Sequence, residues 1–136
     1  MPAYLVPAHH ITAAMSSTRN TIAWILQILL ALAFIASGGN KLLHLADTVK
    51  GFGGMGFPSW FAYFIAGAEV LGGIALLVPG FVRLAAAGLI LIMIGAAYVH
   101  ATKIPGGLLP NGAPALGLLV LLVVLFVLRS PTPARA

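Results

Sequence analysis

Residues 60–78 read WFAYFIAGAEVLGGIALLV, an apolar run of 19 residues with a single charged side chain, Glu69, at its centre. Three further apolar runs cover residues 21–39, 81–99 and 113–128. Each approaches the roughly 20 residues that an α-helix needs to cross about 30 Å of hydrocarbon. Because the runs are continuously apolar and do not alternate, helices are favoured over the strands of a membrane barrel. The sequence therefore predicts an all-α protein with four transmembrane helices.

The composition supports a membrane location and excludes several functional classes. Of 136 residues, 61% are hydrophobic and only 7% are charged, whereas soluble domains are about one quarter charged. The net charge of +5 comes from basic residues scattered at the ends of apolar runs, which does not form a nucleic-acid-binding stripe. The absence of cysteine excludes disulfides, thiolate metal sites and covalently attached haem. The predicted partner is a lipid bilayer, and no nucleic acid is expected.

The connections between the runs predict an up-down-up-down bundle. Pro79-Gly80 is so short that the second and third helices must be antiparallel neighbours. The loop at residues 45–58 is expected to begin as a short interfacial helix, and the loop at residues 101–114 to lie at the same membrane surface. One domain over residues 21–128 is predicted, between a leader at 1–20 and a tail at 129–136. Its helices are expected at about 21–44, 58–78, 81–101 and 113–128.

The basic residues predict the orientation of this bundle. Four crossings place both termini on the side of the Pro79-Gly80 turn. That side carries four arginines: Arg19, Arg83, Arg129 and Arg135. The opposite side carries three lysines: Lys41, Lys50 and Lys103. The positive-inside rule then predicts cytoplasmic termini for a multi-pass protein of a prokaryotic inner (plasma) membrane.

Polar side chains other than arginine concentrate at the predicted outer end, so a site is expected to open outward. Ser37, Lys41 and His44 are spaced to share one face of the first helix. The alternative is an interfacial helix end from which Lys41 extends to the lipid headgroups. The sequence assigns no catalytic residue and no metal site. The candidate ligand-binding residues are Lys41, His44, Glu69, Tyr98 and His100.

Glu69 is the strongest of these candidates. A carboxylate at mid-bilayer costs about 2.5–3.5 kcal/mol on insertion scales and is functional by default. The small residues Ala62, Ala66, Gly72 and Gly73 share nearly the same helical face, so Glu69 is predicted to point into the bundle. The third helix is expected to offer a matching surface of small residues: Ala85, Ala86, Ala87, Gly88 and Gly95. Glu69 could be protonated and bonded to a carbonyl, paired with a base, or act as a proton carrier. A purely structural hydrogen bond between helices is the alternative.

Lys41 is a possible partner of Glu69, but the two residues are predicted to lie at different depths in the membrane. It follows the middle of its apolar run by about eleven residues, or roughly 16 Å along an ideal helix. The sequence therefore favours a water or a ligand between the two side chains over direct contact.

The order of these features resembles the DoxX-like family of small four-helix membrane proteins. The resemblance covers about residues 20–128. No single motif is specific for the family, and the resemblance rests on the order and spacing of several motifs. The motifs are Ala36-Ser37-Gly38-Gly39-Asn40-Lys41-Leu42, Val49-xx-Phe52-xx-Met55-Gly56-Phe57-Pro58, Gly67-Ala68-Glu69-Val70-Leu71-Gly72-Gly73, Pro79-Gly80 with Arg83-Leu84-Ala85-Ala86, and Gly95-Ala96-Ala97-xx-His100.

The resemblance implies a membrane protein associated with redox chemistry. Family members include membrane subunits linked to thiosulfate or quinol respiratory chemistry and proteins associated with oxidative-stress enzymes. Lys41, Glu69 and His100 match recurring polar positions of the family, whereas His44 matches no assigned motif. This chain departs from the redox-partner branch in having no cysteine, and no fused catalytic domain is expected.

Three functions are consistent with the residues. The first is a membrane subunit of a redox or respiratory-type system that holds a quinone or similar lipophilic ligand near the outer end, with Glu69 as a buried acid. The second is a non-enzymatic anchor or assembly partner of another membrane subunit, or of a second copy. The third and least favoured is a small proton or solute transporter, because four short helices leave little room for alternating access. A haem between His44 and His100 is disfavoured, because both residues cap helix ends.

Overall fold

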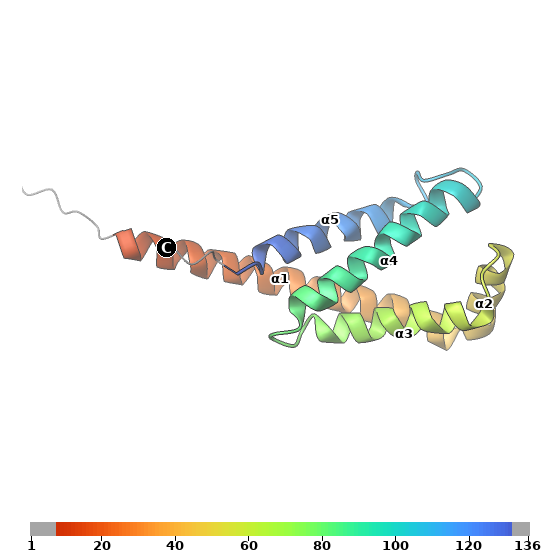
Figure 1. The fold of residues 1–136 in the computed structure, drawn as a ribbon, viewed down its shortest axis with the longest axis horizontal. Coiled ribbons are helices and arrows are strands. Elements are labelled where there is room, and N and C mark those ends of the chain that lie inside the picture. Colours follow the sequence, from red (N-terminus) through yellow and green to blue (C-terminus); the bar gives the residue numbers. More distant parts are fainter. Residues whose placement is uncertain (1–7, 132–136) are drawn as a thin grey trace, which may run out of the picture.

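The structure, a computed structural model, describes residues 8–131, with side chains from Ser17 onward, as an all-helical protein (Figure 1). Within this range there is no strand, which confirms the predicted all-α class. The five helices are α1 (Ala8–Leu43), α2 (Leu45–Gly54), α3 (Ser59–Ala75), α4 (Val82–Lys103) and α5 (Ala113–Leu128).

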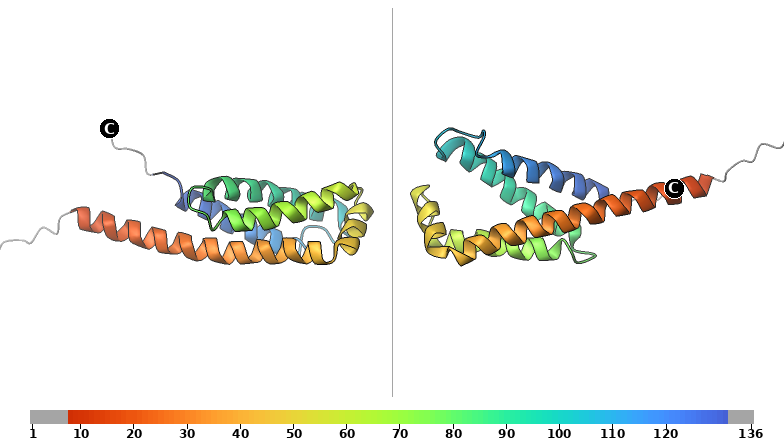
Figure 2. Two further views of the ribbon diagram at one scale, coloured as in Figure 1. Left: turned by 90° about the horizontal axis from the view of Figure 1, so that it is seen from below. Right: turned by 180° about the vertical axis from the view of Figure 1, so that it is seen from behind.

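The four longer helices alternate in direction and form two side-by-side pairs. α1 lies beside α3, and α4 lies beside α5. The two pairs are close at the end that carries the α3–α4 turn and diverge toward the end that carries α2, as Figures 1 and 2 show. Gly80 allows the tight reversal between α3 and α4, because its φ of +92° is a conformation that other residues rarely adopt. The predicted antiparallel contact across Pro79-Gly80 is thus present.

Two helices are long and apolar enough to cross a membrane by length and composition: α1 from Ser17 to its end, and α4. The apolar helices α3 and α5 are shorter, with 17 and 16 residues. Large apolar side chains on all four helices are exposed on the surface of the isolated chain, where a soluble protein would carry charge. These features fit a membrane location.

The first helix and the first loop differ in extent from the prediction. α1 begins at Ala8, inside the segment assigned to a leader over residues 1–20. Helix α2 is the short helix expected at the start of the following loop, and none of its residues is buried in the chain. Its Phe52 ring contacts Phe57 and Phe61 at centroid distances of 5.9 Å, which attaches α2 to the start of α3.

Two glycines bring α1 and α3 into backbone contact. A Cβ atom on Gly38 would lie 2.6 Å from the carbonyl oxygen of Ala66, and one on Gly73 would lie 3.0 Å from that of Ala31. Only a residue without a side chain permits this approach, so these positions fix how α1 and α3 align. The prediction that Gly73 faces a neighbouring helix is confirmed.

The predicted contact between small residues of α3 and α4 is present only in part. Gly72 faces Leu89 of α4, where a Cβ would meet the leucine side chain at 2.8 Å, as expected for contact between these helices. Gly88 and Gly95, however, are exposed, and a Cβ on either would meet no atom within 4 Å. Their predicted placement against α3 is wrong, because the buried Leu89 side chain, about 100° further round the helix, makes the contact instead.

Candidate functional site

Three polar side chains join α1 to α3 near the α2 end of the bundle. Lys41 Nζ lies 2.8 Å from Glu69 Oε2 and donates a second hydrogen bond to Ser37 Oγ, also at 2.8 Å. Ser37 Oγ in turn donates to Glu69 Oε2 at 3.0 Å. We call Ser37, Lys41 and Glu69 the lysine–glutamate group. Of the three arrangements that the sequence left open for Glu69, the structure has the pairing with a base.

The direct contact corrects the expectation that a water or ligand separates Lys41 from Glu69. That expectation placed the middles of the two apolar runs at the same depth. The glycine contacts align the helices differently, because Gly38 faces Ala66 while Gly73 faces Ala31. In this register Glu69 lies level with Ser37, about one helical turn, or roughly 6 Å, from the level of Lys41.

The direction of the side chains closes the remaining gap. In a helix the Cα–Cβ bond tilts toward the N-terminus. Since α1 and α3 are antiparallel, the side chains of Lys41 and Glu69 lean toward each other. The carboxylate is buried with 4% of its side chain exposed, whereas the lysine side chain is 26% exposed. The group therefore has a buried acid and a base that reaches the surface.

His44 lies one turn beyond Lys41 but takes no part in this group. Its ring is exposed, and Nδ1 lies 3.1 Å from the carbonyl oxygen of Asn40 in its own helix. Thr48 of α2 donates hydrogen bonds of 3.0 Å to the carbonyl oxygens of Lys41 and His44. The α1–α2 junction is thus tied down just beside the ammonium group.

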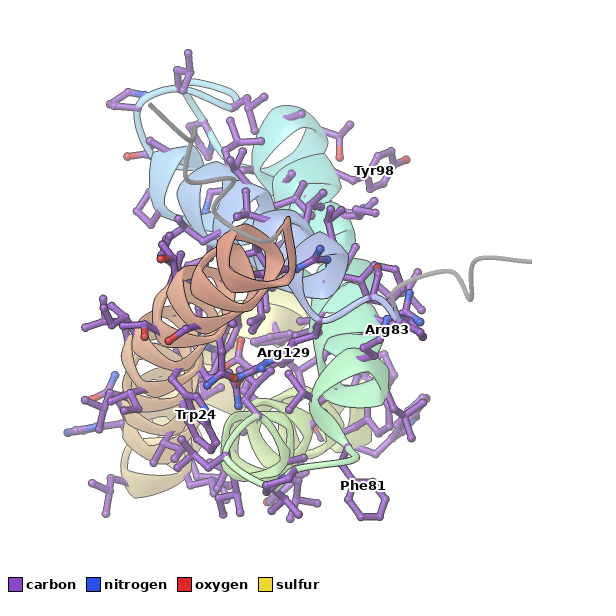
Figure 3. All side chains as sticks on the ribbon, turned by 90° about the vertical axis from the view of Figure 1, so that its left-hand side faces the viewer. Trp24, Phe81, Arg83, Tyr98 and Arg129 are labelled. Atoms are coloured by element: carbon purple, nitrogen blue, oxygen red, sulfur yellow. The ribbon has the colours of Figure 1, made fainter. Side chains whose placement is uncertain are left out.

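Tyr98 and His100 lie on the other helix pair. The Tyr98 side chain is exposed, and His100 Nδ1 lies 2.8 Å from the carbonyl oxygen of Ala96 (Figure 3 labels Tyr98). Among residues 17–131, no hydrogen bond or ion pair joins either side chain to the lysine–glutamate group. The two pairs of helices diverge at this end, which is why the five candidate residues do not meet in one place.

A second polar cluster occupies the opposite end, where the sequence analysis expected little beyond arginines. Gln27 is fully buried; its Nε2 donates to the carbonyl oxygen of Leu76 at 2.8 Å, and its Oε1 accepts from Arg129 Nε at 2.7 Å. Arg129 Nη1 also donates to Asn20 Oδ1 at 2.7 Å. One buried amide thus links α1, the end of α3 and the end of α5.

This end of the bundle, which we call the arginine end, also contains a cavity of about 420 Å³. It lies where the α3–α4 turn meets the end of α5, and Figure 3 views this end directly. The polar and aromatic residues that line it are Asn20, Trp24, Gln27, Arg83 and Arg129. The signals that could have located it were Gln27, a polar side chain inside an apolar run, and arginines at the ends of three apolar runs on one side. Arg135, assigned to the same side, lies outside the described residues.

Comparison with known proteins identifies the family. The model of the DoxX-like family matches residues 25–127. A relative from Bacillus subtilis (strain 168), named "Putative oxidoreductase CatD", is 30% identical over 81 residues, which cover 60% of this chain and 60% of that protein. No solved structure matches the chain. The helices and the lysine–glutamate group described above therefore belong to a member of the DoxX-like family.

Proposed function

We propose that the chain is the four-span membrane subunit of a redox system and holds a quinone or similar lipophilic ligand beside Lys41 and Glu69. The family match and the name of the Bacillus subtilis relative support a redox association. The observation that carries the proposal is the ion pair of 2.8 Å between a buried carboxylate and a partly exposed ammonium group. Charged pairs among apolar helices are costly and in membrane proteins mark functional sites.

Four crossings are supported by the lengths and alternating directions of the helices. At about 1.5 Å per residue, the 17 and 16 residues of α3 and α5 extend roughly 24–26 Å, close to the thickness of the hydrocarbon layer. The ion pair and the arginine cluster then lie toward opposite surfaces. Arg19, Arg83 and Arg129 at the arginine end outnumber the two lysines outside the ion pair at the opposite end, Lys50 and Lys103, which favours the cytoplasm on the arginine side.

The proposed orientation predicts the location of the termini. Alkaline phosphatase fused to either terminus should be inactive in a bacterial host, because this reporter folds only outside the cytoplasm. A cytoplasmic reporter such as green fluorescent protein, fused at the same positions, should be fluorescent. Active alkaline phosphatase at both termini would reverse the orientation, and activity at one terminus alone would exclude four crossings.

The lysine–glutamate group has the donors and acceptor that quinone reduction requires. Two-electron reduction adds one proton to each of the two quinone oxygens, and the electrons would come from a partner subunit. The Lys41 ammonium would donate a hydrogen bond and then one proton to one quinone oxygen. Glu69 would hold the ammonium in place and exchange a proton with it, while Ser37 would orient both groups. The second proton, and the one that restores Lys41, would come from water at the surface that the lysine side chain reaches. His44, Tyr98 and His100 lie toward the same end and stay predicted contacts for the rest of the ligand.

Quinone retention tests this proposal. Protein purified in mild detergent should carry quinone detectable by solvent extraction and chromatography, and Lys41→Met should retain roughly tenfold less. Lys50→Met is the matched control, because Lys50 is an exposed lysine of α2 at the same end and its loss should change little. If Lys41→Met does not fold, Lys41→Gln keeps a donor and should retain an intermediate amount. Wild-type protein that neither retains quinone nor binds a short-chain analogue would refute the proposal.

The exposed glycines of α4 favour a second candidate, assembly with another membrane helix. Gly88 and Gly95 are seven residues apart, lie on one helical face and meet no atom of the chain within 4 Å. Small residues at such positions let a neighbouring transmembrane helix approach closely. A partner subunit or a second copy of the chain would pack there, in agreement with the anchor role considered from the sequence.

A further inference from the structure

The cavity at the arginine end contains positive charge without a nearby acidic side chain. Arg83 and Arg129 both line it. The chain has only two acidic side chains, Asp47 in α2 and Glu69 in the lysine–glutamate group, and both are toward the opposite end of the bundle. Two guanidinium groups therefore share one cavity with no carboxylate side chain to neutralise them.

Arg83 has unused hydrogen-bonding capacity. Its Nε atom is buried and has no hydrogen-bond partner among the described residues. The guanidinium instead lies over the ring of Phe126 in α5, 4.2 Å from the centroid, which fixes its plane without supplying an oxygen acceptor. Buried donors in proteins are nearly always bonded, but Arg83 has no satisfied donor among residues 17–131, and an acceptor from outside the chain would bond to its Nη groups from the cavity that it lines.

Arg129 is held rigidly on the other side of the cavity. Its Nε and Nη1 atoms are bonded to Gln27 and Asn20, and its guanidinium lies 5.6 Å from the ring centroid of Trp24 (Figure 3). No hydrogen bond connects Nη2 to any residue from 17 to 131. Arg19 differs from both, because its Nε and Nη2 donate to the last carbonyl oxygens of α5, at Leu128 and Val127.

We propose that this cavity binds a phosphate group. Planar guanidinium groups with free donors match the oxygens of a phosphate, and the first turn of α4, whose Val82 also lines the cavity, adds the positive end of a helix. A volume of about 420 Å³ accommodates a group of this size. The phosphate can belong to an anionic lipid headgroup or to a soluble phosphate compound. The inference does not depend on the proposed quinone site.

Fluorescence of Trp24 can report binding at this cavity. In a Trp60→Phe background, Trp24 is the only tryptophan, because the chain has two. Protein in non-ionic detergent at constant ionic strength is titrated with phosphatidylglycerol, with diacylglycerol of the same acyl chains, and with inorganic phosphate. We expect a saturable change in Trp24 emission with phosphatidylglycerol and none with diacylglycerol, which has no phosphate. Saturation by inorganic phosphate alone would assign the site to a soluble phosphate compound.

Two arginine variants distinguish specific binding in the cavity from general electrostatic attraction of the phosphate group to this end of the bundle. Arg83→Gln should raise the half-saturating concentration about tenfold or more. Arg19→Gln removes the same charge from the same end without touching the cavity, so its effect should stay below about twofold. If Arg83→Gln does not fold, Arg83→Lys keeps the charge, loses the planar fork and should weaken binding severalfold. Equal effects of Arg83→Gln and Arg19→Gln, or no saturable response to either phosphate probe, would overturn the proposal.

Discussion

Gly73→Leu should produce the largest loss of stability, lowering the free energy of unfolding by roughly 3 kcal/mol. A Cβ at this position would lie 2.9 Å from Ile35 Cγ1 and 3.0 Å from the backbone oxygen of Ala31. A backbone atom cannot move aside as a flexible side chain can, so α3 would have to separate from α1. Thermal unfolding of the protein in detergent, followed by circular dichroism, measures the loss.

Gly67→Leu is the matched control for this substitution. Gly67 lies on the same helix, and a Cβ there would meet no atom within 4 Å. Because leucine favours helix over glycine, this variant should be as stable as the wild type or slightly more stable. Gly38→Leu, on the facing helix, should resemble Gly73→Leu, since its Cβ would lie 2.6 Å from the Ala66 oxygen. A similar loss for Gly67→Leu and Gly73→Leu would contradict the close contact of α1 with α3.

Glu69→Leu should also lower the stability, because it removes the counter-charge of Lys41. Breaking a fully buried ion pair from one side costs about 3–5 kcal/mol. Lys41 is 26% exposed and can extend toward the headgroups, so we expect a smaller loss of about 2 kcal/mol. Glu69→Gln keeps an oxygen that can accept from Ser37 and Lys41, so its loss should be about 1 kcal/mol. Thermal unfolding separates these two variants.

The same pair of variants tests the chemical role of the carboxylate. Glu69→Gln keeps the shape of the side chain but cannot ionise. We expect wild-type binding of a short-chain quinone analogue to depend on pH, and this dependence to be lost in Glu69→Gln. Asp47→Asn removes the other acidic side chain, which is exposed on α2, and should leave the pH profile unchanged. If Glu69→Gln binds quinone with the wild-type profile, the acid–base role is excluded and the assembly function becomes the better candidate.

The periodicity of the apolar runs was sufficient to predict the helices, but not their alignment. The run around Glu69 and the short turn at Pro79-Gly80 correctly predicted an antiparallel helix with the carboxylate turned inward. The contact with Lys41 was not predicted, because register depends on which glycines meet which carbonyls. Gly38 and Gly39 are adjacent residues of the same type, so the sequence does not distinguish them, yet only Gly38 faces α3. That choice depends on the rotation of α1 about its axis, which the sequence does not specify.

The polar cluster at the arginine end was not predicted from the sequence, for a related reason. Arginines at helix ends ordinarily extend to lipid headgroups and need no partner in the chain. The sequence did not reveal that Gln27 is buried within reach of Arg129, which follows it by 102 residues. Contacts between residues so far apart arise only when the end of α5 returns beside residues 19–27 of α1, and a single sequence does not specify that approach.

The buried segment of α1 between the two polar clusters contains only apolar side chains. Gln27 and Ser37 are ten residues apart, about 15 Å along the helix, and the fully buried side chains between them are Leu30, Ala31 and Phe34. Within residues 17–131, Gln27 and Glu69 are the buried polar residues, and neither lies in this segment. Under the proposed function, a proton taken up at Lys41 would find no relay of buried polar side chains along this segment. The absence of such a relay favours proton chemistry confined to one end of the bundle over proton conduction between its two ends.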